Sequence, residues 1–128
     1  MTLTLNELKE EHRFTGKWIT DKSIRRDTKR SPEPLVVCRL FSVEKPLHRV
    51  MVYATAVGNY FVTVNGKKIT SEMLAPGYTS YSKVLQYQAY DITDVLTGRN
   101  ALQAVVSGGW AVGFFGFMGK ARAFSPRK

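Results

Sequence analysis

The sequence predicts an all-β fold, an antiparallel β-sandwich or jelly roll that follows a short polar lead-in. From residue 35 onward, short runs rich in Val, Tyr, Phe and Thr alternate with Gly, Pro, Asn and Ser, which is typical of strands and turns. Several of these runs place apolar side chains at every second position. No segment resembles a helix that would connect parallel strands. The 128 residues suffice for one domain, which we place at 16–128.

The first 34 residues are predicted to lie outside the strands. Residues 1–15 form the lead-in, in which Asn6 followed by acidic residues is compatible with the start of a short helix. Residues 20–34 are predicted to be a charged surface loop because they contain a dense basic run and end in a segment with two prolines.

Strands are expected at 35–42 and 48–57, followed by a hairpin. In the hairpin, Asn65-Gly66 separates the strand at 59–64 from the run at 67–70. A two-residue turn of type I′ needs positive φ at both central positions, which Asn and Gly accept at least cost. This pair is therefore the strongest local signal in the chain.

The remaining elements follow in order. Residues 72–81 are expected to be a loop with a Pro-Gly turn, 84–92 a strand, 93–98 a single capped turn and 101–107 a last strand, which a Gly-Gly pair ends. In the strand at 84–92, Leu85, Tyr87 and Ala89 share one face. By the same alternation, the predicted core comprises Val50, Val52, Val62, Val64, Leu85, Tyr87, Leu102 and Ala104.

One cysteine and two histidines exclude several kinds of chemistry. An intrachain disulfide cannot form, and a Cys/His zinc site would need about four ligands. Cys38 lies inside a strand-like run, where a free cysteine is usually a small buried apolar residue. No metal site is predicted.

The chain carries 19 basic and 10 acidic residues, a net charge of +9, which raises the question of a polyanionic partner. Residues 19–34 contain no aromatic side chain on which bases could stack. Nucleic acid is therefore not the expected partner, and a solvated loop is favoured. The sequence shows no signal peptide and no membrane-spanning apolar stretch, so we expect a cytoplasmic protein without membrane contact.

Three segments in the middle of the chain are distinctive when taken together: GNYFVTVNGKKI at 58–69, LAPGYTSY at 74–81 and YQAYDITDVL at 87–96. They resemble the N-terminal β-sandwich domain of bacterial α-L-rhamnosidases. The resemblance extends to residues 16–19, 40–41, 98–102 and 108–110. The order and spacing of these segments make the match specific, although each segment alone is weak.

The resemblance implies a non-catalytic accessory module, either substrate-recognising or structural, of a glycoside hydrolase that removes terminal α-L-rhamnose. In that family a separate barrel domain inverts configuration with two carboxyl groups, which must lie about 6.5–9.5 Å apart. Glu72, Asp91 and Asp94 offer no convincing pair, so no catalytic residue is predicted and the fragment itself is expected to be inactive. The alternatives are a stand-alone basic module for polyanions and a free-standing lectin.

The sequence departs from the family pattern in two places. The tryptophan motif reads Ser107-Gly108-Gly109-Trp110 without the family's acidic residue. Some modules of the family bind rhamnose through calcium, but no calcium site can be placed here and no cofactor is predicted. The chain also ends before the family's last strands, so we expect exposed edges that are covered by self-association, or strands that lie outside this sequence.

A sugar site needs an aromatic face and groups that hydrogen-bond hydroxyls. The expected partner is a rhamnose-containing glycoside or polysaccharide. The alternative is that the tryptophan plugs one end of the sandwich and the tyrosines pack over it. The candidate sugar-binding residues are Tyr78, Tyr81, Trp110, Asn59 and Asn65.

Overall fold

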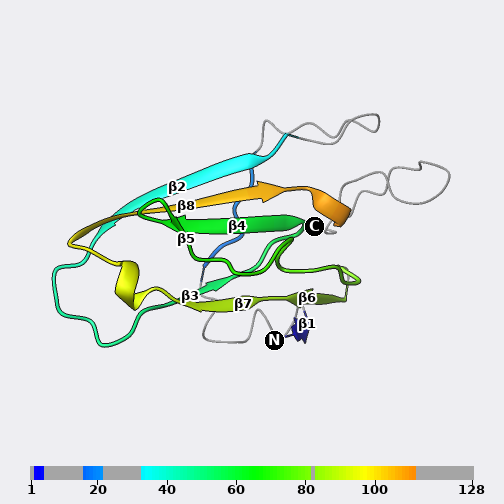
Figure 1. Ribbon diagram of the computed structural model, residues 1–128. Helices are drawn as coiled ribbons and strands as arrows, with labels where there is room; N and C mark the ends of the chain where they lie inside the picture. Colours follow the sequence, from blue (N-terminus) through cyan, green and yellow to red (C-terminus); the bar gives the residue numbers. More distant parts are fainter. Residues whose placement is uncertain (1, 5–15, 22–32, 82, 112–128) are drawn as a thin grey trace.

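The computed structural model describes residues 2–4, 16–21, 33–81 and 83–111. These residues form eight strands and two short 3₁₀ turns (Figure 1). The turns are η1 (Thr93–Val95) and η2 (Gly109–Ala111). The strands are β1 (Thr2–Thr4), β2 (Leu35–Ser42), β3 (Met51–Ala54), β4 (Asn59–Val64), β5 (Lys67–Lys68), β6 (Val84–Gln86), β7 (Gln88–Asp91) and β8 (Arg99–Ser107). Neither turn could cross a membrane.

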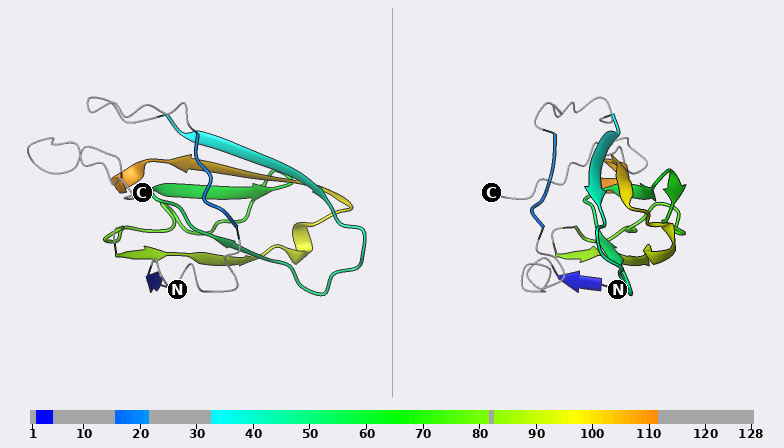
Figure 2. Two further views of the ribbon diagram at one scale, coloured as in Figure 1. Left: turned by 180° about the vertical axis from the view of Figure 1, so that it is seen from behind. Right: turned by 90° about the vertical axis from the view of Figure 1, so that its left-hand side faces the viewer.

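The strands build the predicted antiparallel sandwich. One layer is a four-stranded sheet in the order β2-β8-β4-β5, and the other consists of the pairs β3–β7 and β1–β6. Figure 1 shows β2, β8 and β4 above and β7 and β6 below, and Figure 2 shows the same separation from behind and from the side. Every pairing is antiparallel.

The register of the larger sheet decides which side chains enter the core. Val37 lies opposite Ala104, and Ala104 lies opposite Val62, so the three residues form one row across β2, β8 and β4. Val62 is 3% exposed. Since side chains alternate between the two faces of a strand, the odd positions of β2 and the even positions of β8 and β4 face inward.

The core confirms the period-two prediction. Val62, Val64, Leu85 and Tyr87 are buried. The other four predicted residues are partly buried and pack against the core cluster: Val50, Val52, Leu102 and Ala104.

The predicted hairpin is also confirmed. Val64 pairs with Lys67, so the loop has two residues. Asn65 has φ 52° and Gly66 φ 78°, the signs that a type I′ turn requires.

The prediction of one continuous strand at 84–92 is wrong, because the structure has two shorter strands there. The strand is interrupted at Tyr87, and the two pieces pair with different partners, β6 with β1 and β7 with β3. The interruption shifts the alternation by one position. As a result Tyr90 is buried and Ala89 is exposed, whereas the sequence placed Ala89 on the face of Leu85 and Tyr87.

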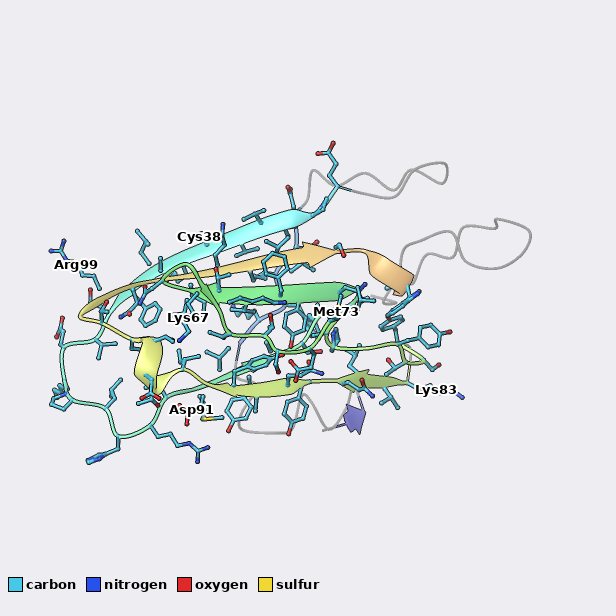
Figure 3. The ribbon with its side chains drawn as sticks, viewed as in Figure 1. Cys38, Lys67, Met73, Lys83, Asp91 and Arg99 are labelled. Carbon is cyan, nitrogen blue, oxygen red and sulfur yellow. The ribbon has the colours of Figure 1, made fainter. Side chains whose placement is uncertain are left out.

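The prediction for Cys38 is also wrong, because its side chain is exposed. Within the described residues β2 pairs only with β8 and forms the edge of its sheet. Cys38 lies on the side of β2 that faces away from the second layer, together with Val36 and Leu40. Figure 3 shows Cys38 on the uppermost strand.

The lead-in contributes β1, a strand that the sequence did not predict and that pairs with β6. The expected helix start at Asn6, most of the loop at 20–34 and the glycine-rich segment after Ala111 lie outside the described residues.

Candidate functional site

Three of the five predicted sugar-binding residues form one aromatic cluster. The ring centroids of Tyr78 and Tyr81 lie 6.1 Å apart with an interplanar angle of 86°. Those of Tyr78 and Trp110 are also 6.1 Å apart, at 82°. Both are edge-to-face arrangements, which aromatic pairs favour. The loop before β6 supplies the tyrosines and η2 supplies the tryptophan, so the cluster lies where β8 ends.

The three rings differ in exposure. Tyr81 is 6% exposed and Trp110 is partly buried, whereas Tyr78 is 59% exposed. Burial raises the pKa of Tyr81, and the neighbouring Tyr78 raises it further. The ring of Tyr78 is therefore exposed to solvent and packs on the less exposed rings of Tyr81 and Trp110.

Asn59 lies beside this cluster. It is the first residue of β4 and pairs with Ser107. A β-carbon on Gly109 would lie 2.5 Å from Nδ2 of Asn59, so the amide packs directly against the backbone next to Trp110. Within the described residues, the buried Oδ1 of Asn59 accepts no hydrogen bond. A buried acceptor of this kind costs about 1–3 kcal/mol.

Asn65 does not join the cluster. It follows β4 at the end of the strand remote from Asn59, roughly 20 Å away at the usual strand rise. Its Nδ2 donates to the carbonyl of Val95 at 2.8 Å and to Oδ1 of Asn100 at 2.9 Å. Its Oδ1 accepts from the backbone N–H of Ala101 at 2.9 Å. These bonds hold the hairpin against β8. Asn65 therefore lies outside the candidate site, and its amide is already engaged in hydrogen bonds within the fold.

The carboxylates considered for catalysis have structural partners. Tyr90 donates its hydroxyl to Oε2 of Glu72 at 2.9 Å. The pKa of Glu72 is lowered, first by its own backbone N–H and also by Tyr90. The general acid of a glycosidase needs a raised pKa, and Glu72 shows the reverse.

Asp91 is committed to the turn that follows β7. Its Oδ1 accepts from the backbone N–H of Thr93 at 3.0 Å and from the Thr93 hydroxyl at 2.6 Å, and its Oδ2 lies 3.0 Å from Nε of Arg49. The Thr93 hydroxyl is the main cause that lowers the pKa of Asp91, with its backbone N–H and Arg49 adding to it. Asp94 is exposed in the same turn.

The structure adds a polar network that sequence reasoning did not single out. The hydroxyl of Tyr60 lies 2.9 Å from the carbonyl of Ala54 and 2.7 Å from Oε1 of Gln88, and it can donate to either. Burial raises the pKa of Tyr60, and it raises that of Tyr90 to about 12. Both residues stay neutral at physiological pH. One feature of the sequence could have indicated this network: a tyrosine at an inward position of a predicted strand. A buried hydroxyl of this kind needs a hydrogen-bond partner.

Two further features bear on a ligand. A hollow of about 340 Å³ is lined by Ser42, Val43, Glu44, Lys45 and Leu47, with no aromatic ring, and lies apart from the aromatic cluster. Among the described residues, no three side chains of His, Cys, Asp or Glu lie close enough together to hold a metal ion. The described carboxylates therefore do not form the oxygen cluster that calcium prefers, and we derive no role for that ion.

The fold and the clustered rings define a β-sandwich domain with an aromatic end. Residues 45–126 match the model of the α-L-rhamnosidase N-terminal domain, and the chain belongs to that family. The α-L-rhamnosidase of Streptomyces avermitilis is 46% identical over 76 residues, which are 59% of this chain and 7% of that protein.

Solved structures agree. The native α-L-rhamnosidase of Aspergillus terreus superposes with a TM-score of 0.70 at 32% identity, covering 80% of this chain and 12% of that one. The Streptomyces avermitilis enzyme complexed with L-rhamnose gives a TM-score of 0.62 at 37% identity, covering 70% and 9%. This chain therefore spans only 7–12% of the length of these relatives and corresponds to their N-terminal domain.

Proposed function

We propose that this chain is a non-catalytic accessory domain of an α-L-rhamnosidase and that it contacts rhamnose-containing glycosides through the cluster of Tyr78, Tyr81 and Trp110. The inverting catalytic barrel lies outside this chain. The family match supports the kind of enzyme, and the cluster supports the contact with sugar.

One observation carries the proposed contact: the exposed ring of Tyr78 stands edge-on to Trp110. The apolar face of a sugar stacks on such a ring, and a ring that is already fixed by its neighbours loses little entropy on binding. Asn59, immediately behind η2, has a carbonyl oxygen without a hydrogen bond in the described part of the chain. A small shift of the loop would offer this acceptor to a sugar hydroxyl.

The non-catalytic role is supported by the state of the acidic residues. Glu72 and Asp91 both have lowered pKa values and bind groups of their own fold. Neither is suited to protonate a leaving oxygen. We expect the chain to release no product from an aryl α-L-rhamnoside, and measurable release that Glu72→Gln abolishes would contradict this part of the proposal.

The contact with sugar is tested by titration with L-rhamnose, with and without calcium, followed by NMR of the two tryptophan indole N–H groups. The signal of Trp110 is expected to shift, while that of Trp18, 58% exposed in the segment before β2, serves as an internal control. Tyr78→Ala should abolish the shift. Met73→Ala is the matched control, since Met73 is 87% exposed and carries no ring.

Either result is informative. Saturable shifts confined to Trp110 support a sugar-recognition module. No shift up to roughly 10 mM, which corresponds to a binding free energy weaker than about 3 kcal/mol, would overturn the contact and leave a structural domain.

A further inference from the structure

The loop that carries two rings of the aromatic cluster is anchored to the larger sheet. Its residue Ala75 is 2% exposed and forms an isolated bridge with Tyr60, whose backbone N–H donates to the carbonyl of Ala75 at 2.7 Å. The backbone N–H of Gly77 donates to the carbonyl of Leu74 at 3.1 Å and closes a turn. Tyr78 follows this turn directly, so the position of its ring depends on the turn.

The side-chain amide of Gln88 joins this turn to the interior. Its Nε2 donates to the carbonyl of Pro76 at 3.1 Å, and its Oε1 lies 2.7 Å from the hydroxyl of Tyr60. The carbonyl of Pro76 can only accept a hydrogen bond, so it selects the NH2 group and leaves the amide oxygen for Tyr60. One side chain at the start of β7 thus connects β4 with the backbone two residues before Tyr78.

Neighbouring contacts fix the backbone on both sides of Tyr78. A β-carbon on Gly77 would lie 2.5 Å from Oε1 of Gln86, so the end of that side chain packs against the turn. On the far side, the hydroxyl of Thr79 donates to the carbonyl of Val84 at 2.7 Å. The ring of Tyr78 is nevertheless 59% exposed. A ring that is accessible on a fixed backbone loses little entropy when it binds a ligand.

Gln88 is the contact of this group that reaches the interior. The bond between Thr79 and Val84 spans five residues of the chain. Gln88 instead lies 12 residues from Pro76 and 28 from Tyr60. Because Tyr60 is 6% exposed and packed in the core, it gives the amide a fixed support. The bond from this amide therefore fixes the distance between Pro76 and the sheet.

We propose that Gln88 is a positioning residue for the sugar contact. Through the carbonyl of Pro76 it fixes the turn before Tyr78 and, with it, the edge-on arrangement of this ring against Trp110. Gln88 acts through Tyr78 and does not itself contact the sugar. The proposal rests on the proposed function, because it concerns the ring that binds the sugar. The arrangement of the rings, however, is measurable without sugar.

The substitution Gln88→Glu separates the two bonds of the amide. The introduced carboxylate can still accept from the hydroxyl of Tyr60, but it cannot donate to the carbonyl of Pro76 and it repels that oxygen. Gln103→Glu makes the same chemical change at an exposed position of β8 and is the matched control.

Two measurements follow the rings and the sugar separately. Without sugar, the nuclear Overhauser effect between the ring of Tyr78 and the indole of Trp110 should weaken in Gln88→Glu and stay unchanged in Gln103→Glu. In a titration, the dissociation constant for L-rhamnose should rise about three- to tenfold in Gln88→Glu, the effect of one lost hydrogen bond. Circular dichroism checks the fold. Gln88→Met has a side chain of similar length without a donor, should act in the same way, and serves as a second variant if Gln88→Glu does not fold.

Two further comparisons separate positioning from general stabilisation. Tyr60→Phe removes the hydroxyl but leaves Gln88 able to donate to Pro76, so it should lower stability without weakening the Overhauser effect between the rings. Below the ordinary pKa of glutamic acid, about 4.3, the carboxylate introduced by Gln88→Glu regains an O–H donor. The Overhauser effect should then recover in Gln88→Glu and not in Gln88→Met. The parent chain at the same pH accounts for Glu72, which lies in the same loop and has a lowered pKa.

The outcomes distinguish this proposal from the proposed function. A parent chain that does not respond to L-rhamnose would overturn the sugar contact, and the positioning role would fall with it. If the parent chain binds L-rhamnose, but Gln88→Glu matches Gln103→Glu in both measurements, the positioning role alone is overturned. The same holds if Tyr60→Phe weakens the Overhauser effect as much as Gln88→Glu, because the loss would then reflect a general loosening of the fold.

Discussion

The side-chain amide of Asn65 donates a hydrogen bond to Oδ1 of Asn100 at 2.9 Å. Asn100 is 4% exposed, and its Oδ1 also accepts from the backbone N–H of Thr97 at 2.7 Å. The pair therefore joins the β4–β5 hairpin to the segment that leads into β8. The amide of Asn65 could in principle bind a sugar hydroxyl, but here it links the hairpin to η1 and to β8.

Two substitutions at Asn65 should separate its backbone role from its side-chain role. Asn65→Gly retains the φ of 52° without strain but loses the amide, and we expect the free energy of unfolding to fall by about 1–3 kcal/mol. Asn65→Ala should lose roughly 1–2 kcal/mol more, because alanine disfavours positive φ. Urea denaturation measures both. If the two variants were equally stable, the positive φ at position 65 would not contribute to the difference. Neither substitution should alter the response to L-rhamnose.

The hydroxyl of Tyr60 should stabilise the interior. Tyr60→Phe removes the donor that faces the carbonyl of Ala54 and Oε1 of Gln88, so buried acceptors lose a partner. We expect a loss of about 1–3 kcal/mol in the free energy of unfolding. A double-mutant cycle with Gln88→Ala should give a coupling of about 0.5 kcal/mol or more. Additive losses would show that the bond to Gln88 contributes little.

Local chemistry made part of this fold predictable from the sequence. The Asn65-Gly66 turn follows from the φ values that two residues tolerate, and the buried faces of β4 and β8 follow from a period of two. The grouping of Tyr78, Tyr81 and Trp110 was predicted from residue types suited to one task. Each of these inferences needs only neighbouring residues or a shared chemistry.

The remaining features depend on distant pairing. The predicted strand at 84–92 is divided at Tyr87 because β1 pairs with the part before it and β3 with the part after it. No feature of those nine residues predicts this division. Cys38 is exposed because it lies on the side of β2 that faces away from the second layer. Which side of a strand faces the second layer depends on how the sheets pack and not on the local pattern. Asn65 is a structural residue because Asn100 lies opposite, which is again a long-range relationship.

Stability should fall in acid partly through Asp91. Its pKa in the folded chain lies below the ordinary value of 3.8, because the Thr93 hydroxyl and then other donors bind the carboxylate. A carboxylate of this kind adds stability above the pKa of the unfolded chain, and that stability is lost as the pH falls through the folded pKa. Asp91→Asn should therefore flatten the stability profile between about pH 5 and pH 2.

The matched control is Asp94→Asn, which removes an exposed carboxylate from the same turn. Chemical denaturation at several pH values compares the two variants with the parent chain. An Asp91→Asn profile as steep as that of Asp94→Asn would show that the bonds to Thr93 and Arg49 do not stabilise the fold.

Among the glycines whose surroundings the structure describes, Gly58 should be the least tolerant of a side chain. Its φ is 128°, and a β-carbon would collide with the carbonyl oxygen of Ser107, which is backbone and cannot move aside. Gly58→Ala should cost about 2–4 kcal/mol, from strain and overpacking together. Gly98→Ala, where a β-carbon meets nothing within 4 Å, should stay within about 1 kcal/mol of the parent chain. Because Gly58 also abuts Gly108, the Trp110 indole signal should move in Gly58→Ala and not in Gly98→Ala, and an unmoved signal would show that β4 and η2 are not rigidly joined.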